Sequence, residues 1–236
     1  MAFRQYQRWL AGRDSRHGRE DPLLPPPYLR VLTAGRADAD SFARLGRTAA
    51  DLFLAAAERH GGAGDRVLEF GVGCGRVARW LAPRVPQFDG CDINPTLLRW
   101  SATHLPGRYR RNRLQPPLPY ADGEFTFVYA LSVFTHMYEP ATRAWFTELA
   151  RVVRPGGLAA VTFFDDALPQ ADAIRAPLER DGYAVLHEGA EGSNLMCGYF
   201  TAAGVAERAG PGWAVAETIN SSATGIGQAL VVLRRA

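Results

Sequence analysis

The sequence contains no lysine, because all 27 of its basic residues are arginine. A chain without lysine cannot form a Schiff base with a carbonyl substrate or with pyridoxal phosphate. It also has no lysine for a Walker-type phosphate-binding loop. Several large classes of enzyme are therefore excluded from the start.

Cysteines are few as well. Cys74, Cys91 and Cys197 lie far apart and form no Cys-x-x-Cys pair. An odd and sparse set of cysteines argues against a disulfide framework and against structural zinc. We therefore predict no metal site, and we interpret Cys74 as a small packing residue rather than a nucleophile.

Long apolar runs are also missing, and the opening segment MAFRQYQRWLAGRD lacks the apolar core of a signal peptide. We expect a cytoplasmic protein, a monomer or homodimer, with no membrane partner. The net charge of +3 is weak evidence for a nucleic-acid partner. The one basic cluster, within residues 108–113, lacks interleaved aromatic side chains, so we interpret it as a solvated strand flank.

The remaining pattern is that of an α/β protein. Short apolar runs expected to form strands alternate with helical patterns, and this alternation predicts a parallel, doubly wound sheet with helices on both faces. Two further apolar runs near the end of the chain, joined by a short glycine-bearing segment, predict an antiparallel C-terminal hairpin. The expected strands are 66–70, 87–91, 109–112, 125–131, 158–164, 213–219 and 229–233, and the expected helices include 76–81, one starting at Asn94-Pro95, and one ending before Pro155.

The domain organisation is predicted to be simple. Residues 1–40 form an N-terminal segment, with a short amphipathic stretch around Tyr6, Trp9 and Leu10, that could serve as a lid over the site. Residues 41–236 form a single domain. Within this domain, residues 165–200, helical at 174–180, form an insertion that could cap the carboxyl edge of the sheet.

The most informative segment is Val67-Leu-Glu69-Phe-Gly71-Val-Gly73-Cys-Gly75-Arg, in which a strand enters a glycine-rich turn and then a helix. Glycines allow the backbone to turn sharply and to approach a ligand closely. The segment also matches the GxGxxA dinucleotide fingerprint, and Asp92 follows about 20 residues on, where an acid would hold a ribose hydroxyl. A nicotinamide-dependent oxidoreductase is therefore one alternative.

Four ordered segments favour another family. Residues 69–76 resemble motif I of the class I S-adenosylmethionine-dependent methyltransferases, and residues 90–95, 117–136 and 149–157 match later motifs of that family in the same order. The resemblance covers about residues 66–164. It implies a Rossmann-like, seven-stranded fold, S-adenosylmethionine as cofactor and S-adenosylhomocysteine as product.

The resemblance also implies roles for individual residues. The backbone at Gly71 and Gly73 would hold the methionine part of the cofactor, with Gly75 in the same loop and Glu69 supporting it. Asp92 would accept hydrogen bonds from both ribose hydroxyls, since a carboxylate has two acceptor oxygens.

The resemblance places the adenine on three further residues. Ile93 would pack on its face, while Asn112 and Leu114 would lie at its edge. Many members of the family have aspartate where Asn112 falls, but an amide carbonyl can still accept a hydrogen bond from the adenine amino group. Ser132 would lie near the transferred methyl group.

The acceptor side is less clearly marked. His136 follows the fourth strand, where an imidazole could act as a general base. Alternatively, it packs against or caps the helix that begins near Glu139. Tyr28, Tyr138 and Tyr199 are candidates for the acceptor pocket by position alone.

We expect a methyltransferase that acts on oxygen or nitrogen of a small molecule, in bacterial secondary metabolism or glycan modification. The (Asp/Asn/Ser)-Pro-Pro-aromatic motif of amino DNA methyltransferases is absent after the fourth strand, which argues against nucleic acid. A cyclase that uses S-adenosylmethionine, or a protein that binds it without methyl transfer, is the second alternative.

Overall fold

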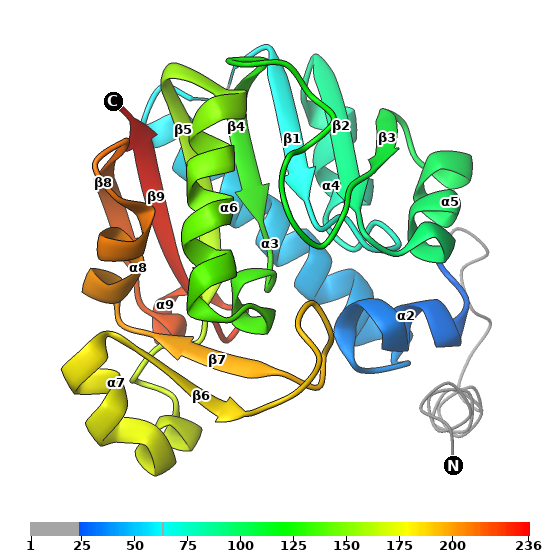
Figure 1. Ribbon diagram of the computed structural model, residues 1–236. Coiled ribbons are helices and arrows are strands. Elements are labelled where there is room, and N and C mark those ends of the chain that lie inside the picture. The colour runs from blue at the N-terminus through cyan, green and yellow to red at the C-terminus, as the bar shows by residue number, and fades with distance from the viewer. Residues whose placement is uncertain (1–23, 63) are drawn as a thin grey trace.

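The computed structural model describes residues 24–62 and 64–236, and its centre is a seven-stranded sheet of order β3-β2-β1-β4-β5-β9-β8 (Figure 1). Strands β1 to β5 are parallel, whereas β9 runs antiparallel to β5 and β8 antiparallel to β9. The predicted doubly wound sheet with an antiparallel C-terminal hairpin is confirmed. The strands are β1 Arg66–Phe70, β2 Gln87–Asp92, β3 Arg108–Arg111, β4 Phe125–Ala130, β5 Val153–Phe163, β8 Trp213–Ile219 and β9 Ala229–Arg235.

Helices cover both faces of the sheet, as expected. Phe53 and Ala56 of α3 lie in the core on one face, and Trp145 and Leu149 of α6 lie in the core on the other. All four side chains are almost completely buried, so the strands between them are apolar on both sides. The main helices are α3 Ala39–Arg59, α4 Ala78–Leu81, α5 Pro95–His104, α6 Glu139–Val152 and α8 Ala202–Ala209.

The helix α5 begins where the sequence predicts it. The Asn94 side chain accepts hydrogen bonds from the backbone N–H groups of Thr96 and Leu97, and Pro95 occupies the first helical position. An asparagine cap satisfies N–H groups that have no partner inside the helix, and proline has no N–H to satisfy. Both features fix the turn that follows β2.

Some predicted boundaries were wrong. The helix expected at 76–81 begins only at Ala78, because the chain is still turning out of the glycine loop before it. The fifth strand begins at Val153 instead of Leu158, because Val153 already pairs with Phe125 and the register then shifts across Pro155-Gly-Gly. The third strand lies one residue earlier than expected, and therefore Asn112 comes directly after it.

Two further segments lie at the carboxyl ends of the parallel strands (Figure 1). One is the helix α2, Pro27–Ala34, which precedes α3. The other, residues 164–200, contains a small two-stranded sheet of β6 and β7. Its elements are the 3₁₀ helix Pro169–Ile174, α7 Arg175–Asp181, β6 Tyr183–His187 and β7 Cys197–Phe200. The stretch around Tyr6, Trp9 and Leu10 lies outside the described residues.

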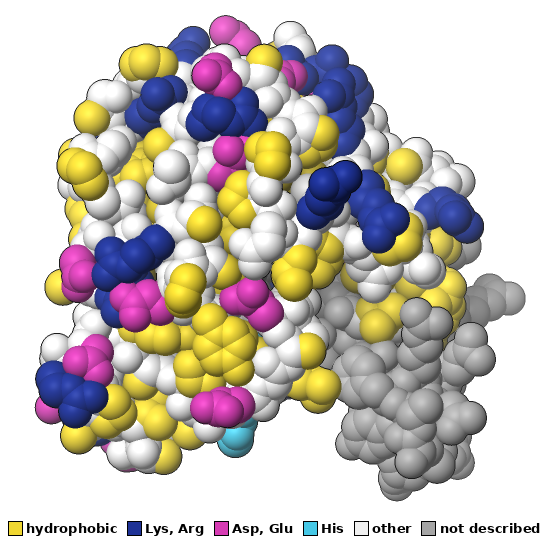
Figure 2. All heavy atoms as spheres, in the orientation of Figure 1, with side chains coloured by type: hydrophobic (Ala, Val, Ile, Leu, Met, Phe, Trp, Pro, Cys, Tyr) yellow, Lys and Arg dark blue, Asp and Glu magenta, His cyan; other side chains and the backbone are white. Residues whose placement is uncertain are grey.

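The basic cluster lies on the edge of the sheet. Arg108, Arg110 and Arg111 belong to β3, and their side chains are exposed, as is that of Arg113. Figure 2 shows basic side chains gathered on the side of the molecule where β3 and α5 lie. Arg108 pairs with Asp89, and Arg110 lies over the ring of Tyr120, so these side chains serve the flank of an edge strand. Among the described residues, no helix has the length and apolar character needed to cross a membrane.

Candidate functional site

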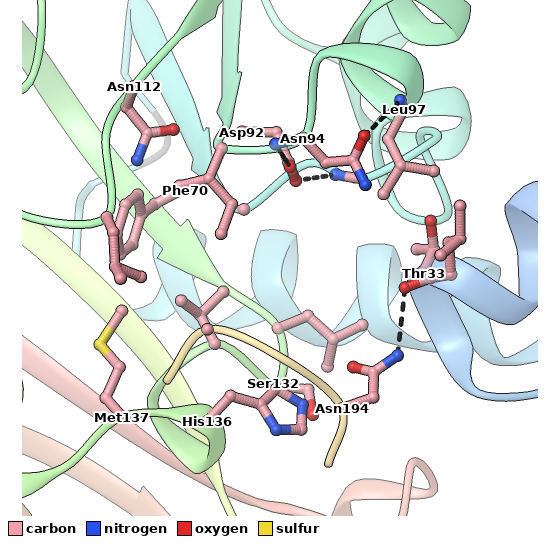
Figure 3. A pocket seen from close by; sticks show the side chains of 18 of the residues that line it. Thr33, Phe70, Asp92, Asn94, Leu97, Asn112, Ser132, His136, Met137 and Asn194 are labelled. Carbon is pink, nitrogen blue, oxygen red and sulfur yellow. Dashed lines mark hydrogen bonds between the residues drawn. The ribbon is translucent and has the colours of Figure 1, made fainter. Parts of the chain in front are cut away.

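A cavity opens at the carboxyl ends of β1, β2, β3 and β4, at the edge where doubly wound sheets bind their ligands (Figure 3). The helix α2 and the loop between β6 and β7 contribute to its lining. The cavity brings together many of the residues singled out in the sequence, namely Gly71, Gly73, Asp92, Ile93, Asn112, Leu114, Ser132 and His136.

The glycine loop is held in one conformation by its neighbours. Gly71 and Gly73 have positive φ angles of 81° and 56°, which strongly favour glycine. The backbone N–H of Cys74 donates a hydrogen bond of 3.1 Å to Thr33 Oγ1 on α2, and Ser101 Oγ on α5 donates one of 3.0 Å to the Gly73 carbonyl. The loop therefore presents backbone, without side chains, to the cavity.

The Cys74 side chain is not available for reaction. Its side chain is fully buried and contacts Thr33. Burial raises the pKa of the Cys74 thiol to about 12, so the thiolate is scarce at neutral pH. This agrees with the interpretation of Cys74 as a packing residue.

Asp92 ends β2 and connects the glycine loop to the next turn. Its Oδ2 accepts a hydrogen bond of 2.7 Å from the Gly73 N–H, and its Oδ1 accepts one of 2.7 Å from the Asn94 N–H. Burial raises the pKa of the Asp92 carboxyl, and these two N–H donors oppose the rise. Each oxygen of a carboxylate can accept more than one hydrogen bond, so both can also receive donors from a ligand.

Asn112 contributes an unpaired acceptor. Its Nδ2 donates a hydrogen bond of 2.9 Å to the Arg113 carbonyl, while its Oδ1 is buried and has no hydrogen-bond partner. A buried carbonyl oxygen without a partner costs about 1–3 kcal/mol. Since Asn112 lines the cavity between the apolar side chains of Ile93 and Leu114, a ligand with a donor at this point would remove that cost.

Ser132 is fixed by a hydrogen-bond network that the sequence did not reveal. It has a φ of 60°, the one positive value for a non-glycine residue in the described part of the chain. Its N–H donates to Thr162 Oγ1 at 2.8 Å, and Gln228 Nε2 donates to its Oγ at 2.7 Å. Thr162 also donates to Gln228 Oε1 at 2.6 Å. Residues of three strand ends thus hold one hydroxyl at the cavity wall.

His136 lies on the short 3₁₀ helix Phe134–His136 after β4, beside Ser132 (Figure 3). Its Nδ1 is 2.7 Å from the Met196 carbonyl, and because a carbonyl only accepts, Nδ1 carries the proton. The neutral ring then has its lone pair on Nε2. Burial lowers the pKa of His136, so the ring is neutral at pH 7 and can accept a proton.

Other residues singled out in the sequence lie outside this cavity. Glu69 points into the interior, where its Oε2 accepts a hydrogen bond of 2.9 Å from Tyr129. Burial raises the pKa of the Glu69 carboxyl to about 8. Gly75 lies behind the loop, where a Cβ would approach Leu105 to 2.1 Å. The lining of this cavity therefore includes neither Glu69 nor Gly75, and their support of the loop stays a prediction.

The three tyrosines also fail to line the cavity. Tyr28 is 41% exposed on α2. The Tyr138 hydroxyl donates to the Gly189 carbonyl at 3.3 Å, and Tyr199 is buried in β7 against Phe164. Position along the chain placed these residues near the acceptor, but the side chains of Tyr138 and Tyr199 pack and tether the 164–200 segment, and that of Tyr28 is exposed.

Sequence reasoning missed residues from the two covering segments. Asn194 Nδ2 donates a hydrogen bond of 3.1 Å to the Leu32 carbonyl, joining the β6–β7 loop to α2 across the cavity. The Gly192 N–H donates to the His136 carbonyl at 2.7 Å. Thr33, Gly192 and Asn194 all line the cavity, although no motif surrounds them in the sequence.

Comparison with known proteins agrees with this geometry. Residues 68–161, which include the glycine loop, Asp92 and His136, match a family model described as a methyltransferase domain. Over these residues the chain resembles a methyltransferase domain. The chain is similar to the methyltransferase GfsG of Streptomyces halstedii, at 31% identity over 106 residues, or 42% of this chain and 37% of GfsG.

It is also similar to an uncharacterized methyltransferase of Mycobacterium sp. (strain JLS), at 35% identity over 115 residues, or 48% of this chain and 44% of the relative. These matches span less than half the length of either curated relative. Among solved structures, magnesium protoporphyrin IX methyltransferase of Synechocystis PCC 6803, with bound S-adenosylhomocysteine, has a TM-score of 0.62. That alignment covers 99% of this chain and 95% of the other at 15% identity, a likeness of fold.

Proposed function

We propose that this chain binds S-adenosylmethionine in the cavity and transfers its methyl group to an oxygen or nitrogen of a small molecule. The observation that carries the proposal is that Asp92 and the unpartnered Asn112 Oδ1 line the same cavity as the glycine loop. Acceptor oxygens at these two points match the ribose hydroxyls and the adenine amino group of an adenosine.

The surrounding residues fit the rest of the cofactor. Ile93 supplies apolar surface for the face of an adenine, and Leu114 supplies it at the edge. Gly71 and Gly73 offer bare backbone to the methionine part, and a larger residue at either position is excluded because its Cβ would lie 2.4 or 2.6 Å from the side chain of Val133 or Thr33. The acceptor oxygens, the apolar side chains and the bare glycine backbone of this cavity therefore suit S-adenosylmethionine.

When bound, S-adenosylmethionine supplies a methyl group on a sulfonium that leaves as a neutral thioether. The protein has to orient the acceptor, exclude water and remove a proton from it. His136 Nε2 is the free, unprotonated ring nitrogen and is the group we assign as base. Ser132, held by Gln228 and Thr162, orients the acceptor beside it.

A small-molecule acceptor is supported by the solved relative that acts on magnesium protoporphyrin IX, which is itself a small molecule. The cavity is also covered by α2 and the β6–β7 loop, which suits an acceptor that enters whole. We include a role in bacterial secondary metabolism or glycan modification in the same proposal.

The first test is a calorimetric titration of the purified protein with S-adenosylhomocysteine, with NADH titrated in parallel. We expect one-to-one micromolar binding of S-adenosylhomocysteine and none of NADH. Binding of NADH alone would overturn the proposal in favour of an oxidoreductase. In turnover assays with S-adenosylmethionine, formation of S-adenosylhomocysteine supports methyl transfer, whereas methylthioadenosine would indicate a different use of the cofactor.

A further inference from the structure

A second lobe of the cavity opens beyond His136. Five residues line both lobes and therefore form their junction: Thr33, Leu131, Ser132, His136 and Asn194. The second lobe includes neither Asp92 nor Asn112. A ligand held there would meet the first lobe at Ser132 and His136, where the proposed base lies.

The apolar walls of the second lobe come from distant parts of the chain, and polar side chains, including those of His187 and Gln228, complete its lining. Leu45 belongs to α3, Phe164 follows β5, Met196 precedes β7 and Ile226 precedes β9. Among the residues described as lining the lobe, none is aspartate or glutamate. Such walls suit the hydrocarbon part of an organic molecule.

Arg76 introduces a positive charge into this apolar lobe. Its Nε is buried and has no hydrogen-bond partner, and within the described part of the chain no carboxylate forms an ion pair with it. A Cβ on Gly46 of α3 would lie 2.1 Å from the Arg76 carbonyl oxygen and 3.1 Å from Arg76 Cγ, so α3 packs directly against the backbone and the first part of this side chain. Arg76 itself lines the lobe.

The acid that interacts electrostatically with Arg76 is Glu69. Burial raises the pKa of Glu69 to about 8, and its Oε2 is already bonded to Tyr129. The raised pKa favours the neutral form of Glu69, while an arginine side chain keeps its charge. The positive charge beside the lobe lacks a fixed partner, and an uncompensated charge in an apolar setting is costly.

We propose that the second lobe binds a methyl acceptor that carries a carboxylate, with Arg76 as its counter-ion, an inference that rests on the proposed function. A guanidinium can donate two parallel hydrogen bonds to a carboxylate. Arg76 is the one arginine among the residues described as lining this lobe, which matches a single negative charge rather than a phosphate dianion. The acceptor is then a small organic acid whose hydroxyl or amine lies near His136.

The test uses the full chain saturated with S-adenosylhomocysteine and titrated with matched probes. These are 4-hydroxybenzoate, 4-hydroxyphenylacetate and 4-hydroxycinnamate, each compared with its amide, together with phenyl phosphate. We expect at least one carboxylate to bind about 10-fold or more tightly than its amide, which corresponds to ~1.4 kcal/mol. Arg76→Gln removes this preference, and Arg76→Lys, which keeps the charge but not the planar fork, retains part of it.

Arg84→Gln is the matched control, because Arg84 is an exposed arginine that pairs with Asp51 and lines neither lobe. It should keep the full preference for the carboxylate. Equal binding of each acid and its amide, no binding of any acid, tighter binding of phenyl phosphate, or an unchanged preference in Arg76→Gln would each overturn the inference. Failure of the wild-type chain to bind S-adenosylhomocysteine would instead overturn the proposed function. Should Arg76→Gln fail to fold, Arg76→Lys decides alone, and an unreduced preference there counts against the inference.

Discussion

The two lobes of the cavity are assembled in different ways. The lobe at the glycine loop takes its polar ligand-facing atoms from residues 71–114, at the ends of three neighbouring strands. The second lobe takes its walls from α3, the end of β5, the β6–β7 loop and the entry to β9. The cofactor lobe is built mainly from backbone and one carboxylate, so residues close together in the sequence can form it. The acceptor lobe depends on how distant segments pack against one another.

The lobes also differ in charge. Asp92 places two acceptor oxygens in the first, and Arg76 places a donor beside the second. The two residues come from neighbouring turns after β2 and β1, yet Asp92 lines the first lobe and Arg76 the second. This difference predicts that variants in one lobe leave binding in the other intact, and the following predictions test that separation.

The largest effect is expected at the junction. His136→Ala should lower turnover by roughly 10²- to 10⁴-fold, the usual contribution of a general base. The affinity for S-adenosylhomocysteine, measured by titration, should stay unchanged because Nε2 is assigned to the acceptor. An equal loss of cofactor affinity would show that His136 acts on the cofactor instead of the acceptor.

The pH dependence of the wild-type turnover rate is a second test of His136 as the base. Burial lowers the pKa of His136 below its ordinary value of 6.5. The base must be neutral, so turnover should rise as the pH increases through this lowered pKa and be level at pH 7. A rate that still rises steeply above pH 7 would contradict the assignment, unless the acceptor itself titrates, which the His136→Ala profile would reveal.

Asp92→Ala comes next in size. It should weaken binding of S-adenosylhomocysteine by about 1.5–3 kcal/mol, the value of hydrogen bonds to a charged group, or roughly 10- to 150-fold. Asp92→Asn keeps one acceptor oxygen and should lose less. Circular dichroism should show a retained fold, and probe binding in the second lobe should change little. Unchanged cofactor affinity in Asp92→Ala would contradict the ribose assignment.

The smallest effect is expected at Asn112. Asn112→Leu removes the unpaired Oδ1 and should weaken S-adenosylhomocysteine by ~1 kcal/mol, about 5-fold. Asn112→Asp keeps acceptor oxygens. This variant should therefore bind S-adenosylhomocysteine more tightly than Asn112→Leu does. Calorimetric titration of the two variants side by side makes the comparison, and equal losses in both would show that the amide nitrogen, not the oxygen, matters.

Much of the fold was predictable because its signals are local. The strands β1 and β8 have the expected bounds, and Asn94-Pro95 marks the start of α5 as predicted. The start of β5 was misjudged because the pairing of Val153 with Phe125 is a contact between strands that no local pattern encodes. Local turn chemistry is visible in a sequence, but strand register is not.

By itself the sequence determined the order of the elements, the glycine loop and the acid that follows it. These depend on backbone freedom, helix capping and apolar periodicity, all of which act within a few residues. Only the tertiary structure decided that Gln228 holds Ser132, that Asn194 reaches α2, and that Tyr28, Tyr138 and Tyr199 lie outside the cavity. The physical reason is that side-chain contacts between distant segments follow from how the layers pack, and a linear pattern carries no record of that packing.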